Sequence, residues 1–369
     1  MKAMVLPDER DNHQQYGLLE YPMTPPQANG SVVEIANGIL WLRMPMPMAL
    51  DHINVYLLKD VDGWYIVDTG LNTEKTRQLW LQVIEQHCQK KMIKGIICTH
   101  FHYDHSGLTS WLTQTFNVPL YMTYGEFYML NTISRSVDTL GNKHQLAFYH
   151  RTGTPRSEVD AMMDSCRNDP FIKHSPESFT RLRGGDVLTI GQRRWQIIIG
   201  EGHSPEHACL YCEEDKLLLS GDQLLPSISS NILVNEMEPQ GQPLKHWLRS
   251  LEQLQTLDIN TLVLPAHGPV FRQMHLRVQQ LIDHHVEQLS LLKSFALQQK
   301  EFNTYQAMKY LFKRSRSLAP IESMMALGET LAHLNWLEDN GDLICQSMND
   351  SGINTYLPTP IIKKTGGTL

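Results

Sequence analysis

Residues 99–107, with the sequence THFHYDHSG, constrain this chain more than any other segment. Four donor side chains, His100, His102, Asp104 and His105, come directly after the apolar run Ile96–Cys98. A buried strand that ends in such a group indicates a metal-binding loop, because imidazole and carboxylate are ligands of Zn²⁺, Fe and Mn²⁺. A chance polar loop does not account for four donors within six positions.

Three further donors stand where other predicted strands end. His203 lies in GEGHSPEH, Asp222 in LLLSGDQ and His267 in LVLPAHGP. Open α/β sheets place their binding sites at the carboxyl edge of the strands, so we expect these side chains to meet the first four there.

Strand-like and helix-like patterns alternate twice along the chain, which predicts an α/β (α+β) fold. Residues 31–70 have the pattern of antiparallel strands, and a helix capped by Asn72 leads into a buried strand over residues 91–100. A second round follows, with strands from residue 186 to 222, a helix over residues 243–257 and a strand over residues 261–268.

The domain organisation follows from changes in this pattern. Residues with helical propensity, rich in Tyr, Phe and Met, interrupt the alternation at about 125–178 and predict a helical insertion. After the last strand, helices and a wing-like hairpin predict a small helical domain. We predict an N-terminal arm over residues 1–30, a catalytic domain over residues 31–280 that contains the insertion, and a C-terminal domain over residues 281–369.

Composition excludes several classes of protein. The net charge of −7 disfavours nucleic acid as a partner, since a phosphate backbone attracts the opposite sign. No apolar run approaches the roughly 20 residues that span a bilayer, so we expect no membrane partner. The N-terminus lacks the pattern of a secretory signal, and the six scattered cysteines predict reduced thiols, so we expect a cytoplasmic protein. A homo-oligomer is compatible with the sequence.

The order of the motifs resembles that of the metallo-β-lactamase-fold metallohydrolases. His-x-His-x-Asp-His is followed by Gly-His, Gly-Asp and Pro-Ala-His-Gly, and Val67–Gly70 is similar to an early turn of that superfamily. The resemblance covers roughly residues 31 to 280 and implies a four-layer αβ/βα sandwich with a dinuclear site. It assigns His100, His102 and His203 to one metal ion, Asp104, His105 and His267 to the other, and Asp222 to a bridge between them.

The bridging residue refines the resemblance. Lactam-cleaving members with the same loop typically carry Cys at this position, so Asp222 makes the chain more similar to glyoxalase II and its esterase, lactonase and phosphodiesterase relatives. The C-terminal pattern resembles the winged-helix domain appended to some members, which include acyl-thioester hydrolases and an endoribonuclease.

These features predict a hydrolase with two divalent metal ions, for which zinc is expected and iron or manganese would take the same donors. It would cleave a thioester, ester or lactone of a small acyl-type substrate through a metal-bridging hydroxide. Asp104 is the predicted catalytic residue, which orients that hydroxide and passes its proton to the leaving group. The alternatives are a phosphodiesterase or endoribonuclease of the same fold and a metal-dependent regulator that binds an acyl ligand.

Several residues have two interpretations. Asp68 is either a turn residue or an acceptor that orients a metal-bound imidazole. Glu206 stands where the resembling motif often carries Gly, and it either tunes substrate choice or faces solvent. His207, on a strand-like segment, is interpreted as structural.

The candidates for substrate binding are apolar and aromatic side chains that could equally be core residues. They are Met46, Met48, Tyr124, Phe127 and His150. The remaining histidines, including His284, His285 and His333, lack ligand spacing and are interpreted as surface or helix residues.

Overall fold

The computed structural model describes residues 19–48, 50–88, 92–136, 139–167, 175–313, 318–347 and 352–360. The chain divides into two compact units. Unit 1 comprises residues 1–140, 165–232 and 245–282, and unit 2 comprises residues 141–164, 233–244 and 283–369. The predicted insertion is therefore shared between the units. Residues 1–18 of the predicted arm and 168–174 of the predicted insertion lie outside the described residues.

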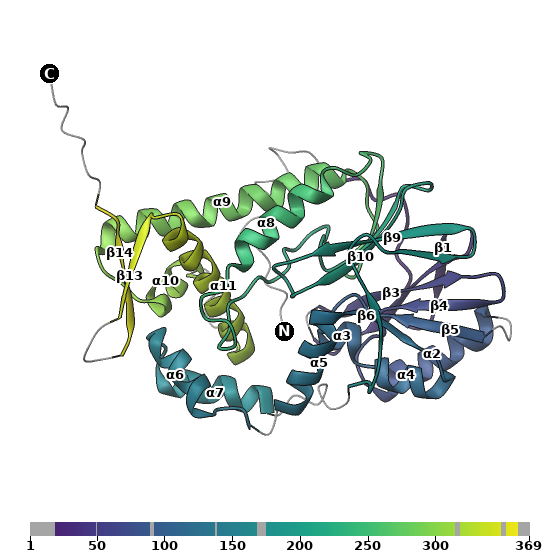
Figure 1. Ribbon diagram of the computed structural model, residues 1–369, viewed down its shortest axis with the longest axis horizontal. Helices are drawn as coiled ribbons and strands as arrows, with labels where there is room; N and C mark the ends of the chain where they lie inside the picture. Colours follow the sequence, from purple (N-terminus) through teal and green to yellow (C-terminus); the bar gives the residue numbers. More distant parts are fainter. Residues whose placement is uncertain are drawn as a thin grey trace, which may run out of the picture. The chain divides into compact units, whose positions relative to one another are not determined.

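The first sheet of unit 1 has seven strands in chain order, each beside the next. Its strands β3, β4 and β5 are labelled side by side in Figure 1. They are β1 (Val32–Ala36), β2 (Ile39–Pro45), β3 (His52–Lys59), β4 (Gly63–Val67), β5 (Met92–Ile97), β6 (Leu120–Thr123) and β7 (Thr180–Leu182). The pairs from β1 to β4 are antiparallel and those from β4 to β7 are parallel. The loops that follow β4 and β5 therefore leave the sheet at the same edge.

The second sheet has five strands in the order β12-β11-β10-β9-β8. They are β8 (Val187–Ile190), β9 (Arg193–Gly200), β10 (His207–Cys212), β11 (Leu217–Gly221) and β12 (Leu262–Pro265). Only the pair of β11 and β12 is parallel. As a result β9, β11 and β12 run in one direction, and their carboxyl ends share an edge.

Alternating side chains place apolar residues on both faces of the first sheet. Trp41 and Tyr56 pack with Trp195 of the second sheet in a core between the sheets. Leu42 and Val55 point to the other face, where they share a core with helices α2 (Glu74–His87), α4 (Thr109–Phe116) and α5 (Tyr124–Ser136). This arrangement confirms the predicted layered αβ/βα class.

Helix α2 begins one residue later than predicted. Its N-cap is Thr73 and not Asn72, because the Thr73 side chain accepts a hydrogen bond from Thr76 N, while Asn72 Oδ1 accepts one from Arg77 Nη2. Trp80, fully buried on this helix, donates to the carbonyl of Thr69 over 2.7 Å. That contact ties α2 to the turn after β4.

Backbone hydrogen bonds join the two sheets at one edge. Ala208 N on β10 donates to the carbonyl of Thr99, just after β5, over 2.9 Å. Asn54 N on β3 donates to the carbonyl of Ala266, just after β12, over 2.6 Å. The ends of strands from both sheets are thereby held together where the predicted donors lie.

Unit 2 is mainly helical and ends in a two-stranded sheet. It contains α6 (Lys143–Arg151), most of α7 (Arg156–Arg167) and of α9 (Met274–Gln299), α10 (Thr304–Leu311), α11 (Pro320–Asp339), β13 (Leu343–Ser347) and β14 (Asn354–Pro358). An isolated bridge pairs Phe302 with Tyr356 of β14. The helix, helix and hairpin order is the one predicted, and its likeness to a winged helix stays a prediction. No helix within the described ranges is long and apolar enough to span a bilayer.

Candidate metal centre

The predicted donors of unit 1 all lie just after strands, at the edge where the sheets are joined. His100 and His102 follow β5, and Asp104 and His105 lie on the one-turn helix α3 (Tyr103–Ser106). The other three donors follow β9, β11 and β12, respectively, and are His203, Asp222 and His267. The structure therefore brings together all seven side chains that the sequence singled out.

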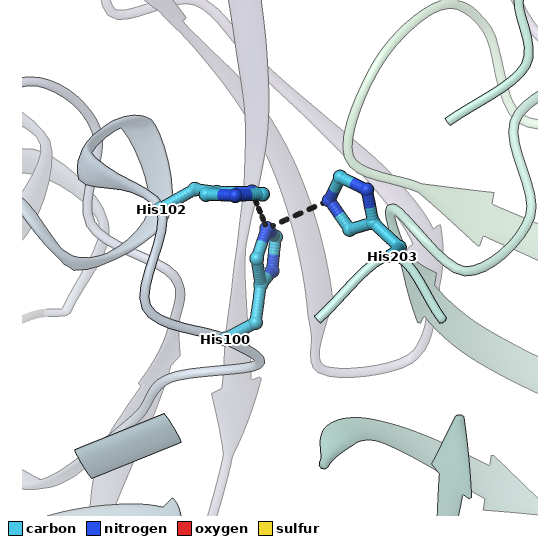
Figure 2. A group of neighbouring side chains, drawn as sticks. All are labelled: His100, His102 and His203. Carbon is cyan, nitrogen blue, oxygen red and sulfur yellow. Dashed lines mark hydrogen bonds between the residues drawn. The ribbon is translucent and has the colours of Figure 1, made fainter. Parts of the chain in front are cut away.

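Three of the histidines form one group around a single nitrogen atom. His100 Nε2 lies 2.8 Å from His102 Nδ1 and 3.2 Å from His203 Nε2 (Figure 2). The donor atoms of a tetrahedral zinc site, with bonds of about 2.0–2.1 Å, lie roughly 3.4 Å apart. The spacing of this group is close to that value.

The other donors form a second group around Asp104 and Asp222. His267 Nε2 lies 3.3 Å from Asp104 Oδ2 and 3.4 Å from Asp222 Oδ1. His105 Nε2 lies 3.5 Å from the same Asp222 Oδ1. The second oxygen, Asp222 Oδ2, lies 3.5 Å from His203 Nε2 of the first group. The two oxygens of Asp222 thus face different groups.

Backbone carbonyls fix the ring orientation of two histidines. His203 Nδ1 lies 2.8 Å from the carbonyl oxygen of Asn231, and His267 Nδ1 lies 2.9 Å from that of His52. A carbonyl oxygen only accepts, so each Nδ1 carries the proton and donates it. Each Nε2 therefore presents a lone pair to the centre of the site.

Side chains fix the ring orientation of two more histidines, His105 and His100. His105 Nδ1 donates to Asp68 Oδ2 over 2.8 Å. Thr99 Oγ1 donates its own proton to the Asp68 carboxylate, so it accepts from His100 Nδ1, 3.1 Å away. In the neutral ring, the Nε2 atoms of His105 and His100 therefore carry a lone pair as well. Asp68 is the acceptor that orients an imidazole, and it also occupies a left-handed turn position with φ 58°.

The charges of the two groups differ. Burial lowers the pKa of His100 well below its ordinary value and that of His102 to about 3, and neighbouring imidazoles add to both shifts. Burial also lowers the pKa of His105 and His267, but the Asp104 and Asp222 carboxylates outweigh it and raise both values. His100 and His102 are therefore neutral imidazoles, and the second group attracts positive charge.

The donors fit divalent metal ions. His105 Nε2 and Asp222 Oδ1 are buried and have no hydrogen-bond partner among the described residues. With both Nδ1 atoms protonated, two lone pairs face each other at 3.2 Å between His100 and His203, an arrangement that a cation between them would stabilise. Borderline nitrogen donors with carboxylates are the ligand set of Zn²⁺, Fe or Mn²⁺.

Comparison with known proteins identifies the family. The family model described as the metallo-beta-lactamase superfamily matches residues 48–267. The chain belongs to the metallo-β-lactamase superfamily. A crystal structure of a beta-lactamase domain protein from Burkholderia ambifaria is 35% identical, with a TM-score of 0.82, over 95% of this chain and 99% of that one.

Named relatives agree with a hydrolase of this superfamily. A probable metallo-hydrolase, YqjP of Bacillus subtilis, is 25% identical over 81% of this chain and 92% of its own length. An atrochrysone carboxyl ACP thioesterase of Aspergillus fumigatus is 23% identical over 65% of this chain and 58% of its own. A human acyl-coenzyme A thioesterase, MBLAC2, is 24% identical over 51% and 64%. The chain is therefore an enzyme, a metallo-β-lactamase-fold hydrolase.

A buried glutamate that the sequence did not single out joins the two histidine loops of this fold. Glu126 Oε2 accepts from Phe101 N over 3.0 Å, and Glu126 Oε1 accepts from Ser204 Oγ over 2.6 Å and from Glu206 N over 2.7 Å. Burial raises the pKa of Glu126 to about 7, although these hydrogen bonds lower it. The residues beside His100 and His203 are thus held by one side chain.

Neither interpretation of Glu206 describes its contacts. Glu206 Oε2 accepts a hydrogen bond from Gly125 N over 2.7 Å, near the start of α5. His207 is fully buried on β10, as its structural interpretation implies, and its Nε2 accepts from Asp222 N over 3.1 Å. Both residues therefore support the loops that carry the donors.

The predicted substrate residues have varied surroundings. Met46 and Phe127 are buried in the core beside α2 and α4, with Met48 packed against it. Tyr124 is 48% exposed and lies under the Arg181 guanidinium. His150 belongs to α6 in unit 2. A role of these five residues in substrate binding stays a prediction.

Proposed function

We propose that the chain is a dinuclear metal hydrolase that cleaves acyl thioesters, with related esters and lactones as secondary substrates. The observation that carries the proposal is the position of Asp222. Its two oxygens face separate groups of histidines at 3.4–3.5 Å, and Oδ1 is a buried acceptor for which the described part of the chain offers no hydrogen bond. A carboxylate in that position suits a bridge between two cations.

The donor sets follow from the lone pairs described above. His100 Nε2, His102 Nδ1 and His203 Nε2 would hold one ion. The second set is Asp104, His105 Nε2 and His267 Nε2, with Asp222 between the two sets. When bound, two divalent ions supply an activated water and polarise the carbonyl that is attacked.

Asp104 is the residue that we assign to proton transfer. Burial raises the pKa of Asp104, but His105 and His267 outweigh it, so the pKa is lowered and the carboxylate is ionised at neutral pH. Its Oδ2 faces these two imidazoles, at 3.7 and 3.3 Å. Asp104 Oδ1 would take the proton of the attacking water and pass it to the leaving group.

Two observations favour an acyl thioester over a phosphodiester. Two named relatives are thioesterases, of an acyl carrier protein and of acyl-coenzyme A. The net charge of −7 opposes binding of a polyanionic nucleic acid.

The experiment compares hydrolysis of a medium-chain acyl-coenzyme A with that of bis(4-nitrophenyl) phosphate by the metal-loaded enzyme. We expect thioester turnover that falls about 10²–10⁴-fold in Asp104→Asn, the range for loss of a general acid–base group. Asp160→Asn, an exposed aspartate on α7, is the matched control and should keep full activity.

The opposite pattern would reject the proposal. Diester cleavage without thioester cleavage would make the phosphodiesterase alternative the function of this site. Thioester turnover that Asp104→Asn leaves unchanged would remove Asp104 from the chemistry.

A further inference from the structure

A second group of metal-type donors lies buried in unit 2, apart from the seven donors described above. His284 and His285 are neighbours on α9, and Glu329 lies on α11. One ligand atom from each lies within 4.8 Å of the other two. These residues are 8%, 0% and 4% exposed, respectively. Of the two interpretations of the histidines, as surface or helix residues, the surface one is therefore wrong, and both histidines lie on a helix.

A chain of hydrogen bonds determines the protonation of His285. His333 Nδ1 lies 2.8 Å from the backbone carbonyl oxygen of Glu329, which only accepts, so His333 carries its proton on Nδ1. His333 Nε2 is therefore an acceptor, and it lies 3.1 Å from His285 Nδ1. His285 must carry its own proton on Nδ1 to donate there. The lone pair of His285 is consequently on Nε2.

That lone pair is buried and unsatisfied. His285 Nε2 has no hydrogen-bond partner among the described residues. In a metal-ligating histidine, one ring nitrogen donates a hydrogen bond to a fixed acceptor and the other offers its lone pair to the metal. His285 has this arrangement, with Nδ1 as the donor and Nε2 as the nitrogen with the free lone pair. His333 would be the residue that positions the ligand and not a ligand itself.

The buried carboxyl group of Glu329 has no ion-pair partner within the ranges that the structure describes. Burial raises its pKa to about 8. Burial also lowers the pKa of His285 well below its ordinary value, so the protonated imidazole is disfavoured as a counterion. A divalent cation would satisfy both the carboxylate and the bare nitrogen, and two histidines with one glutamate form a ligand set that zinc takes in proteins.

We propose that His284, His285 and Glu329 form a second metal site, separate from the dinuclear centre, which takes a divalent transition-metal ion such as Zn²⁺. The site joins α9 to α11, and its donor set does not depend on the proposed hydrolytic function.

The test counts the ions that the full-length chain binds. Metal-free protein is titrated with Co²⁺, whose visible absorption reports coordination by nitrogen and oxygen, and zinc content is measured after loading and desalting. We expect His285→Gln and Glu329→Gln each to bind about one ion per chain fewer than the wild type. His87→Gln, at the last residue of α2, is the matched control and should keep the wild-type count. Wild-type counts in both variants would overturn the site.

A second measurement leaves α9 and α11 unaltered. The double variant His102→Ala/His267→Ala removes one donor from each half of the dinuclear centre. We expect it to retain about one Co²⁺ per chain, which would be lost when Glu329→Gln is added. No bound Co²⁺ in the double variant, with its circular dichroism unchanged, would overturn the inference. Because activity is not measured, the proposed function could fail while this site stands.

Discussion

Replacement of Asp68 by Asn tests whether the outer partner of a histidine controls the metal centre. Asp68 Oδ1 accepts from Thr99 N over 2.8 Å, so the amide oxygen of Asn would occupy that position. The amide NH₂ would then face His105 Nδ1, where a carboxylate oxygen now accepts at 2.8 Å. Two donors cannot bond, so His105 would move its proton to Nε2 and lose the lone pair that faces Asp222.

The loss of such a partner lowers metal affinity about 10–100-fold, which corresponds to roughly 1.4–2.7 kcal/mol. The assay is competition for Zn²⁺ between the protein and a chromophoric chelator, which resolves ions that are bound with different affinities. Nitrogen NMR shifts of labelled histidine would report the tautomer of His105 directly.

The matched control for this prediction is Asp51→Asn. Asp51 Oδ1 also lies close to a histidine Nδ1, 2.6 Å from that of His52, but its side chain is 81% exposed. Because the Asp51 carboxylate is exposed, its pair with His52 contributes little, so zinc affinity should stay at the wild-type value. Equal affinities in Asp68→Asn and the wild type would refute the reasoning from tautomers.

Three further changes should act on the same centre. Glu126→Gln should lower the free energy of unfolding by about 1–3 kcal/mol, because an amide NH₂ cannot accept the hydrogen bonds of a buried carboxylate. Urea denaturation would measure this loss, with Glu177→Gln as the control, and equal midpoints for Glu126→Gln and the wild type would contradict the prediction. Gly221→Ala should reduce bound metal, because the new Cβ would lie 2.5 Å from His207 Nε2. The control is Gly185→Ala, which is also at positive φ but in open space and should leave bound metal unchanged. The measurement is zinc content, and equal zinc content in the two variants would contradict the prediction. Removal of metal by a chelator should lower the thermal midpoint, and Zn²⁺ at about 100 times its Kd should restore roughly 2.7 kcal/mol of the free energy of unfolding. A midpoint that changes with neither treatment would exclude a metal bound to the folded state.

The positions of the seven donors could be predicted from the sequence because each follows a strand within a few residues. A strand end fixes where a side chain emerges, and the strands themselves had clear apolar patterns. Strands β6 and β7 were missed, since β6 (Leu120–Thr123) has four residues and β7 (Thr180–Leu182) has three, too few to show a period.

Glu126 could not be predicted for a different reason. It lies on the amphipathic helix α5, where a glutamate ordinarily faces solvent, and its partners come from residues 101, 204 and 206. Burial of this carboxyl group depends on three segments that meet only in the folded chain. The same holds for His285, whose partner His333 is 48 residues away on another helix.

The identity of the ligands and their orientation therefore have different origins. Histidine and aspartate side chains are visible in a sequence, but the groups that set the ring orientation include the backbone carbonyls of Asn231 and His52, which any residue could supply. Only the fold determines which carbonyl faces which Nδ1. Asp68 and Thr99 are the exceptions, because their side chains do this for His105 and His100, respectively. Of these two, Asp68 is the one that could be singled out in the sequence. A search by motif therefore finds the histidine and aspartate residues of a metal site. Which ring nitrogen carries the lone pair for the metal follows only from the hydrogen bond that the other nitrogen makes in the folded chain.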